Sequence, residues 1–165
     1  LIPVANVLLP EAHPDMRHRH TLSGRLAYSI EDANASVHLL YRAYLDSWDI
    51  AALTPEIRYY QELGSGVLLR LRHRFYKQTP SFFYEDDPTA YAIGDPFVTA
   101  DPKMSGFHSN LMGIALSVDL DVLFDTRLEV FSGLKFDFSV DHIWNTNRFG
   151  NGILATAGLS VPFGE

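Results

Sequence analysis

The residues from Gly64 to Gln78 read Gly-Ser-Gly-Val-Leu-Leu-Arg-Leu-Arg-His-Arg-Phe-Tyr-Lys-Gln and place arginines at alternate positions among apolar residues. An α-helix would distribute this pattern around its circumference because its faces repeat every 3.6 residues, whereas a β-strand sends alternate side chains to opposite faces. The stretch is therefore predicted to be a strand that follows a tight glycine turn. Leucines occupy one face and arginines the other, so the two faces require different surroundings.

The same alternation recurs along the whole chain and predicts an all-β fold without a convincing helix. Pro55 is expected to cost the third strand one ladder hydrogen bond. The seven predicted strands cover residues 17–30, 36–46, 53–62, 67–78, 110–118, 127–138 and 153–163.

The connections suggest how these strands are arranged. Those after the first, third and fifth strands are read as short and the others as longer, which is typical of an antiparallel up-and-down transmembrane β-barrel. Residues 79–103 are then a long extracellular loop, and the chain ends in the periplasm. Bacterial barrels have an even strand number. A strand is therefore expected before residue 1, unless residues 1–9 form a poor one, and the 7–8 strands seen here belong to a larger barrel.

Bulk composition limits the alternatives. A chain of 165 residues fits one domain, so residues 1–165 are expected to form a single barrel domain or the C-terminal part of one. A formal charge of -7 argues against nucleic acid as a partner. The absence of cysteine excludes disulfides and thiolate metal sites. The chain starts without an initiator methionine or a signal-peptide pattern, which predicts a mature product or a piece of a longer protein.

The environment of each face follows from the cost of burying charge. Alternation alone fits a membrane barrel or a soluble lipocalin-like barrel with the leucines inside. Strands that alternate over about 11 to 14 residues suit a tilted bilayer crossing, and an arginine facing lipid would cost roughly 2 to 4 kcal/mol. The predicted lumen-lining residues are Arg25, Arg42, Tyr44, Glu56, Arg58, Tyr60, Arg70, Arg72, Arg74 and Tyr76. The predicted lipid-facing residues are Leu22, Leu26, Val37, Leu39, Tyr41, Ile57, Leu69, Leu71, Phe75, Leu128, Val130, Leu159 and Val161.

Three motifs resemble a family of bacterial outer-membrane proteins known as a domain of unknown function. They are Pro-Asp-x-Arg-x-Arg from Pro14, Tyr-Arg-x-Tyr-x-Asp-x-Trp-x-Ile from Tyr41, and Arg-x-Arg-x-Tyr-x-Gln from Arg72, which is followed by Phe83-Tyr84. The resemblance covers roughly residues 10–90 and implies an outer-membrane barrel with no assigned catalytic or binding residue. Members of the family are longer, so the chain would correspond to their C-terminal half.

Several side-chain groups are candidate sites, each with a simpler structural explanation. His18 and His20, near His13 and Met16, have strand spacing suited to a transition metal, but a polar rim loop is the favoured explanation. Acidic residues of the long loop offer oxygen ligands for calcium without the spacing of an EF-hand. They are Glu85, Asp86, Asp87, Asp95 and Asp101. The aromatic residues Phe82, Phe83, Tyr84 and Tyr91 are expected to pack over the barrel mouth or rim.

The main functional hypothesis is an outer-membrane β-barrel, either porin-like or a scaffold or sleeve for a partner protein. Its arginines would attract anions if the acidic side chains do not neutralise them. Its expected partners are the lipid bilayer and either another envelope protein or the missing N-terminal part of the barrel, and no cofactor is expected. The alternatives are a soluble lipocalin-like ligand-binding barrel and an outer-membrane lipid hydrolase. The hydrolase would draw on Ser23, Ser36, Ser109, His38 or His108, although no Gly-x-Ser-x-Gly motif is present. The protein is otherwise expected not to be an enzyme.

Overall fold

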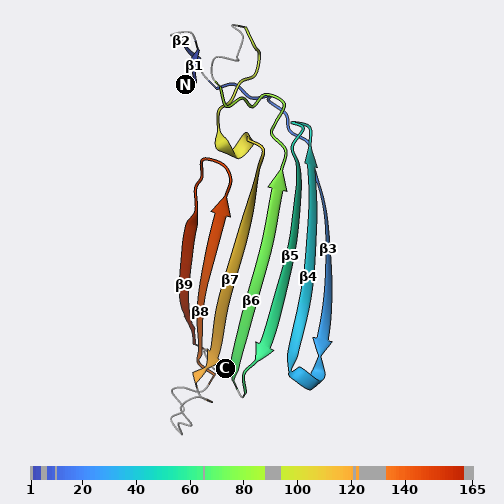
Figure 1. Cartoon of the computed structure of the whole chain (residues 1–165), viewed down its shortest axis with the longest axis vertical. Coiled ribbons are helices and arrows are strands. Elements are labelled where there is room, and N and C mark those ends of the chain that lie inside the picture. Colours follow the sequence, from blue (N-terminus) through green and yellow to red (C-terminus); the bar gives the residue numbers. More distant parts are fainter. Residues whose placement is uncertain are drawn as a thin grey trace.

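The structure is a computed structural model that describes residues 2–4, 7–9, 11–64, 66–87, 94–120, 122 and 133–161. Seven long strands form one antiparallel sheet in which each strand pairs with its neighbours in sequence (Figure 1). The predicted all-β, up-and-down arrangement is confirmed. The strands are β3 (Arg19–Ile30), β4 (Ala35–Asp46), β5 (Ala51–Glu62), β6 (Val67–Gln78), β7 (Phe107–Asp119), β8 (Lys135–Asn145) and β9 (Gly152–Ser160).

Tight turns at one end of the sheet use residues with positive φ. The link between β3 and β4 contains the short 3-10 helix η1 (Glu31–Ala33) and closes with Asn34 at φ 46°. The link between β5 and β6 uses Gly64 and Gly66, both at positive φ, which glycine adopts without steric cost. The Gly-Ser-Gly turn predicted before the arginine strand is therefore present.

Pro55 interrupts the sheet as expected. Between β5 and β6, pairing runs from Leu53 with Lys77 directly to Glu56 with Arg74, so Thr54 and Pro55 are left out of the ladder. A proline lacks the N–H that a central strand donates. The register is nevertheless the same on both sides of the interruption.

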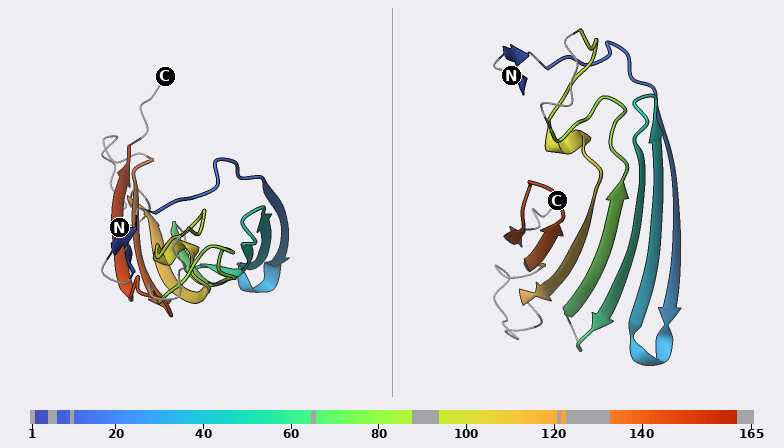
Figure 2. Two further views of the ribbon diagram at one scale, coloured as in Figure 1. Left: turned by 90° about the horizontal axis from the view of Figure 1, so that it is seen from above. Right: turned by 45° about the horizontal axis from the view of Figure 1, so that its top comes forward.

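The sheet is strongly curved (Figure 2). Seen from above, its strands follow an open arc, and the segment between β6 and β7 lies within the concave side, together with the 3-10 helix η3 (Pro102–Met104). Among the described residues, β3 pairs only with β4 and β9 only with β8, so the arc is not closed. Closure into a barrel remains a prediction.

Two predictions about the chain trace are wrong. The sixth strand, predicted over 127–138, excludes Gly133 and Leu134 and runs from Lys135 to Asn145, so part of the predicted link belongs to the sheet. Residues 127–132 lie outside the described residues. The alternation is broken at His142, which faces outward, and at Ile143, which faces inward, and this break concealed the continuation. The links also do not alternate in length, because residues 31–34, 47–50 and 63–66 are equally short and the fifth link spans 120–134.

The N-terminal residues form their own small sheet. Strands β1 (Ile2–Val4) and β2 (Val7–Leu9) pair with each other and not with the large sheet, so neither of these two segments supplies its eighth strand. No helix among the described residues is both long and apolar enough to cross a membrane.

Candidate functional site

The polar residues of the sheet gather on its concave face. Directly paired residues share a face, and Ser36, Tyr60 and Arg70 form one such row across three strands. Gln78 of the same face donates to Ser105 of the segment inside the arc, which identifies this face as the concave one. We call it the inner face. All the residues predicted to line a lumen lie on it: Arg25, Arg42, Tyr44, Glu56, Arg58, Tyr60, Arg70, Arg72, Arg74 and Tyr76. Their contact with lumen water stays a prediction.

A buried ion pair connects two strands that are not neighbours. Arg72 of β6, Gly113 of β7 and Asp141 of β8 form one row. Arg72 Nε donates to Asp141 Oδ1 at 2.8 Å and Nη2 donates to Oδ2 at 2.5 Å, passing over Gly113. Asp141 is only 4% exposed. A Cβ on Gly113 would lie 2.0 Å from Asp141 Oδ1, so this position requires glycine for the pair to form.

The remaining inner-face arginines differ in how they are neutralised. Arg58 forms an ion pair with Glu56 on its own strand. Arg25 makes a 3.2 Å hydrogen bond with the ring nitrogen of His38. Arg42, Arg70 and Arg74 form no ion pair with an acidic side chain in the part of the chain that the structure describes. The acidic residues therefore neutralise only part of the arginine ladder.

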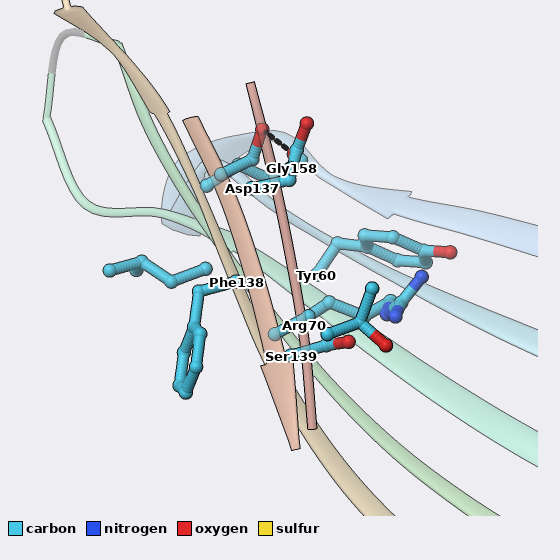
Figure 3. Close-up of a pocket in the computed structure, with 11 residues that line it drawn as sticks. Tyr60, Arg70, Asp137, Phe138, Ser139 and Gly158 are labelled. Atoms are coloured by element: carbon cyan, nitrogen blue, oxygen red, sulfur yellow. Dashed lines mark hydrogen bonds between the residues drawn. The ribbon is translucent and has the colours of Figure 1, made fainter. Parts of the chain in front are cut away.

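An open cavity of about 390 Å³ lies on the inner face beside Arg70. Figure 3 shows Tyr60, Arg70 and Ser139 projecting to one side of the sheet and Phe138 to the other. The Nε atom of Arg70 is buried and has no hydrogen-bond partner among the described residues. This cavity combines an unpaired cation with neighbouring hydroxyl groups.

The opposite face, which we call the outer face, is apolar and exposed. Leu22 and Leu39 retain 74% and 47% of their accessible surface. The predicted lipid-facing residues that lie here are Leu22, Leu26, Val37, Leu39, Tyr41, Ile57, Leu69, Leu71, Phe75 and Leu159, with Val161 directly after β9. Leu128 and Val130 lie outside the described residues. Whether lipid touches this face stays a prediction.

A compact group of side chains lies at the end of the sheet where β4 and β6 end, which we call the rim. Asp46, at the end of β4, accepts from Arg17 Nε at 2.8 Å, Tyr44 Oη at 2.7 Å and the backbone N–H groups of Trp48 and Ile50. Its side chain is fully buried. The Arg17 guanidinium also lies 4.2 Å from the centre of the Trp48 ring. These groups are held in one geometry by ionic, polar and aromatic contacts.

The long segment after β6 docks onto this group through Phe83. The Phe83 ring contacts Trp48 edge-on at 5.1 Å, and His13 contacts both rings. We define the rim cluster as His13, Arg17, Tyr44, Asp46, Trp48 and Phe83. Phe83 and Tyr84 pack at the rim as expected, whereas Phe82 is largely exposed. Tyr91 lies outside the described residues.

Hydrogen bonds between side chains and backbone groups fix the same segment over the end of the sheet. Gln78 Nε2 donates to the carbonyl oxygens of Lys103 at 3.0 Å and Ser105 at 2.7 Å. Asp101 caps η3 by accepting from Lys103 N. Asn147, from the link between β8 and β9, donates to the Pro102 carbonyl at 3.1 Å. The segment is therefore attached at both ends and from a neighbouring link.

The candidate metal ligands are not brought together in the structure. His13 stacks on Trp48, and the backbone of His18 bonds Ser47. His20 lies exposed on β3. Within the described ranges, no group of three or more His, Asp or Glu side chains could hold an ion.

The acidic loop residues have other partners. Asp101 caps η3, Glu85 accepts from the backbone N–H of Asp86, and the Asp86 carboxylate accepts from Tyr84 and pairs with Arg148. These contacts provide the simpler explanation for the acidic loop. No hydrogen bond between described residues joins the hydroxyls of Ser23, Ser36 or Ser109 to a histidine. The hydrolase alternative thus gains no geometric support.

Comparison with known proteins identifies a family. The chain matches, over residues 3–150, the family described as "Protein of unknown function (DUF3570)". The chain belongs to the DUF3570 family. The resemblance to a domain of unknown function is thereby confirmed, and the description gives no location or activity. Searches of curated proteins and of solved structures found no match.

In this DUF3570 protein, the three sequence motifs meet at the rim. Arg17 belongs to the first motif, Asp46 and Trp48 to the second, and Tyr76 and Gln78 to the third, while Phe83 follows them in the loop. They hold the loop segment against the strand ends. Asp141 and Gly113 were missed as functional residues. Gly113 faces inward within a predicted strand and was a usable signal, whereas Asp141 lies beyond the predicted end of its strand.

Proposed function

We propose that this DUF3570 protein forms part of the wall of a bacterial outer-membrane β-barrel. Its outer face contacts lipid, and its inner face lines a polar lumen that passes small solutes or encloses a partner protein. The observation that carries this proposal is the polarity of the curved sheet, with charges on the concave face and exposed aliphatic side chains on the convex one.

The large accessible surface supports a protein that contacts something besides water. The accessible surface is 11200 Å², whereas a soluble monomer of this mass would expose about 8,200 Å². Leucine and isoleucine account for much of the outer face, and soluble monomers rarely expose a contiguous apolar surface of this kind. Contact with lipid tails removes the free-energy cost of exposing this apolar face to water, and no further protein element has to pack on it.

Strand length and aromatic placement are also consistent with a membrane wall. The seven strands span between 9 and 13 residues, and a tilted crossing requires about 9 to 11. Phe75, Asn110 and Trp144 lie in one row of the outer face, towards the rim end of their strands. Aromatic girdles at the level of the lipid headgroups flank the apolar band of outer-membrane barrels.

Site-directed spin labelling tests this two-sided wall. Because the chain contains no cysteine, single cysteines can be introduced at Ala155 and Thr156, which are consecutive exposed residues of β9 on the outer and inner face. Ile57 and Thr54 give a second pair on β5. The full-length protein, with any other cysteine replaced, is labelled with a nitroxide and reconstituted in lipid vesicles.

Opposite accessibilities are expected at the two members of each pair. Oxygen, which concentrates in lipid, should increase the relaxation rate of the nitroxides at Ala155 and Ile57. A water-soluble nickel chelate should increase the relaxation rate of those at Thr156 and Thr54. A protein that remains soluble without detergent, with immobilised labels at Ala155 and Ile57, would instead support the lipocalin-like alternative. Conductance of the full-length protein in planar bilayers then separates an open pore from a sleeve, since only the pore gives channel events.

A further inference from the structure

We propose that the inner-face cavity binds the anionic group of a small organic carboxylate or phosphate through Arg70. This inference rests on the proposed function, because the lumen is what brings a dissolved solute to this face. It adds a binding site, with a residue that recognises the ligand.

Arg70 lacks an acceptor at an atom that water does not reach. Its Nε is buried and forms no hydrogen bond to the described residues. Leaving a buried donor unsatisfied is unfavourable, most of all for a charged group, so such atoms call for a missing partner. An oxyanion fits the planar guanidinium because two parallel N–H donors can hold two of its oxygen atoms.

The neighbouring arginines do not compete for this role. Arg72, two residues along β6, is held by Asp141, and Arg58 is held by Glu56. Asp137 lines the cavity with Arg70 but forms no ion pair with it, and its Oδ1 accepts from Ser117 Oγ at 2.6 Å. The positive charge of Arg70 is therefore available within the cavity.

The rest of the cavity suits a molecule larger than a bare ion. Its volume of about 390 Å³ falls within the usual range for small-molecule sites, roughly 300 to 1,000 Å³. Hydroxyl groups of Tyr60, Ser139 and Thr156 and apolar groups of Leu68 and Ala115 line it. Asp137 adds a negative charge to the lining, which disfavours a polyanion and favours a ligand that also carries a hydroxyl or ammonium group.

An oxyanion can come from two sources, a dissolved solute or an acidic side chain of the protein. We favour the solute because the cavity is open and far larger than one carboxylate group. The Tyr60 ring is already positioned by its contact with His38 at 4.8 Å, so part of the wall is formed before any ligand arrives. A preformed wall lowers the entropic cost of binding.

Equilibrium dialysis of the full-length protein in detergent, with radiolabelled lactate, a hydroxy monocarboxylate, and with inorganic phosphate, tests the site. Glucose serves as the uncharged probe. The variants are R70Q, R70K and R74Q, of which R74Q removes an unpaired arginine from the same face of β6 but outside the cavity. Thermal stability in the same detergent checks that each variant is folded.

We expect saturable binding of at least one anion and no binding of glucose. Loss of a charged hydrogen bond predicts affinity about 10-fold to 100-fold lower in R70Q, whereas R74Q should change it less than twofold. R70K should be intermediate because lysine keeps the charge but loses the planar fork.

Three results would overturn the inference. The first is wild-type protein without saturable anion binding, and the second is an equal loss in R70Q and R74Q, which would mean diffuse attraction. The third is a structure of the full-length protein with an acidic side chain on Arg70, which would assign the oxyanion to the protein. Spin labelling keeps these outcomes separate from failure of the barrel, because the two-sided accessibility pattern does not depend on Arg70.

Discussion

The rim cluster and the outer face belong to the same sheet but treat apolar side chains differently. At the rim, Phe83 is 4% exposed and packs on Trp48, as in the core of a globular protein. On the outer face, Leu39 is nearly half exposed although it lies in the middle of β4. Within the described chain, only the rim cluster buries its apolar side chains.

The buried carboxylates, in contrast, have partners within the chain both at the rim and on the wall. Asp46 is buried at the rim with a full set of donors, and Asp141 is buried on the inner face with Arg72. Buried carboxylates are tolerated when they are paired in this way. The rim is therefore self-sufficient, whereas the wall depends on whatever covers its outer side.

The largest effect is expected from D46N. The change leaves Arg17 without its counter-charge and replaces one acceptor oxygen by an NH2 group, which then faces the donors of either Arg17 and Tyr44 or the Trp48 and Ile50 backbone. Breaking a buried ion pair on one side costs about 3 to 5 kcal/mol. The measurement is chemical unfolding followed by tryptophan fluorescence in a W144F background, so that Trp144 does not contribute, together with limited proteolysis within residues 79–106, which should become faster.

D119N is the control for this loss of charge. Asp119 pairs with Lys135 at 3.1 Å, and the two side chains are 34% and 56% exposed, whereas that of Asp46 is fully buried. Exposed pairs contribute less than about 1 kcal/mol, so D119N should change little. Equal destabilisation by D46N and D119N would show that the rim cluster does not anchor the segment.

The next effect compares L39R with L154R in lipid. Leu39 lies on the outer face and Leu154 on the inner face opposite Asp141, and their exposed fractions are similar, 47% and 55%. An arginine against lipid costs about 2 to 4 kcal/mol, whereas one in a wet lumen near a carboxylate costs little. The free energy of folding into vesicles, measured by denaturant titration, should therefore fall only in L39R. Equal effects would remove the distinction between the faces.

A smaller effect is expected from G113A. The added Cβ would lie 2.0 Å from Asp141 Oδ1 and 3.0 Å from Arg72 Cγ, so the ion pair must shift. Overpacking of this kind costs about 1 to 3 kcal/mol. Unfolding in the same vesicles provides the measurement. Gly158 also lies on the inner face, but a Cβ there meets nothing within 4 Å, so G158A should be nearly neutral. Matching losses in the two variants would indicate that backbone flexibility, not the ion pair, is responsible.

The wall was predictable from sequence because strand periodicity is a local property. A residue such as Leu71 reveals its face through its neighbours at every second position, and the register then aligns it with Tyr59 and Ile114. The sixth strand was misplaced because its face pattern is irregular beyond Ser139, where His142 faces outward and Ile143 inward. Periodicity fails where polarity does not follow the face.

The contacts that hold the site together were not predictable, because they join residues far apart in sequence. Arg72 and Asp141 meet across an intervening strand, and nothing near either residue specifies the other. The same holds for Asp46 with Arg17 and for Phe83 with Trp48. The motifs marked Arg17, Asp46 and Trp48, but only the fold shows that they form one cluster.

The smallest expected effect concerns Tyr84 in the docked segment. Burial, followed by its hydrogen bond to Asp86, raises the pKa of the Tyr84 phenol from 10.0 to about 12. Between these values the unfolded chain loses the proton while the folded chain keeps it, so ionisation stabilises only the unfolded state. The stability that Tyr84 contributes is complete below pH 10 and is lost as the pH rises towards 12. Absorbance titration at 295 nm should show one fewer late-titrating phenol in Y84F than in wild type, and an earlier titration of that phenol in D86N. A Y84F protein whose alkaline titration matches wild type would show that the segment does not hold this tyrosine against the rim.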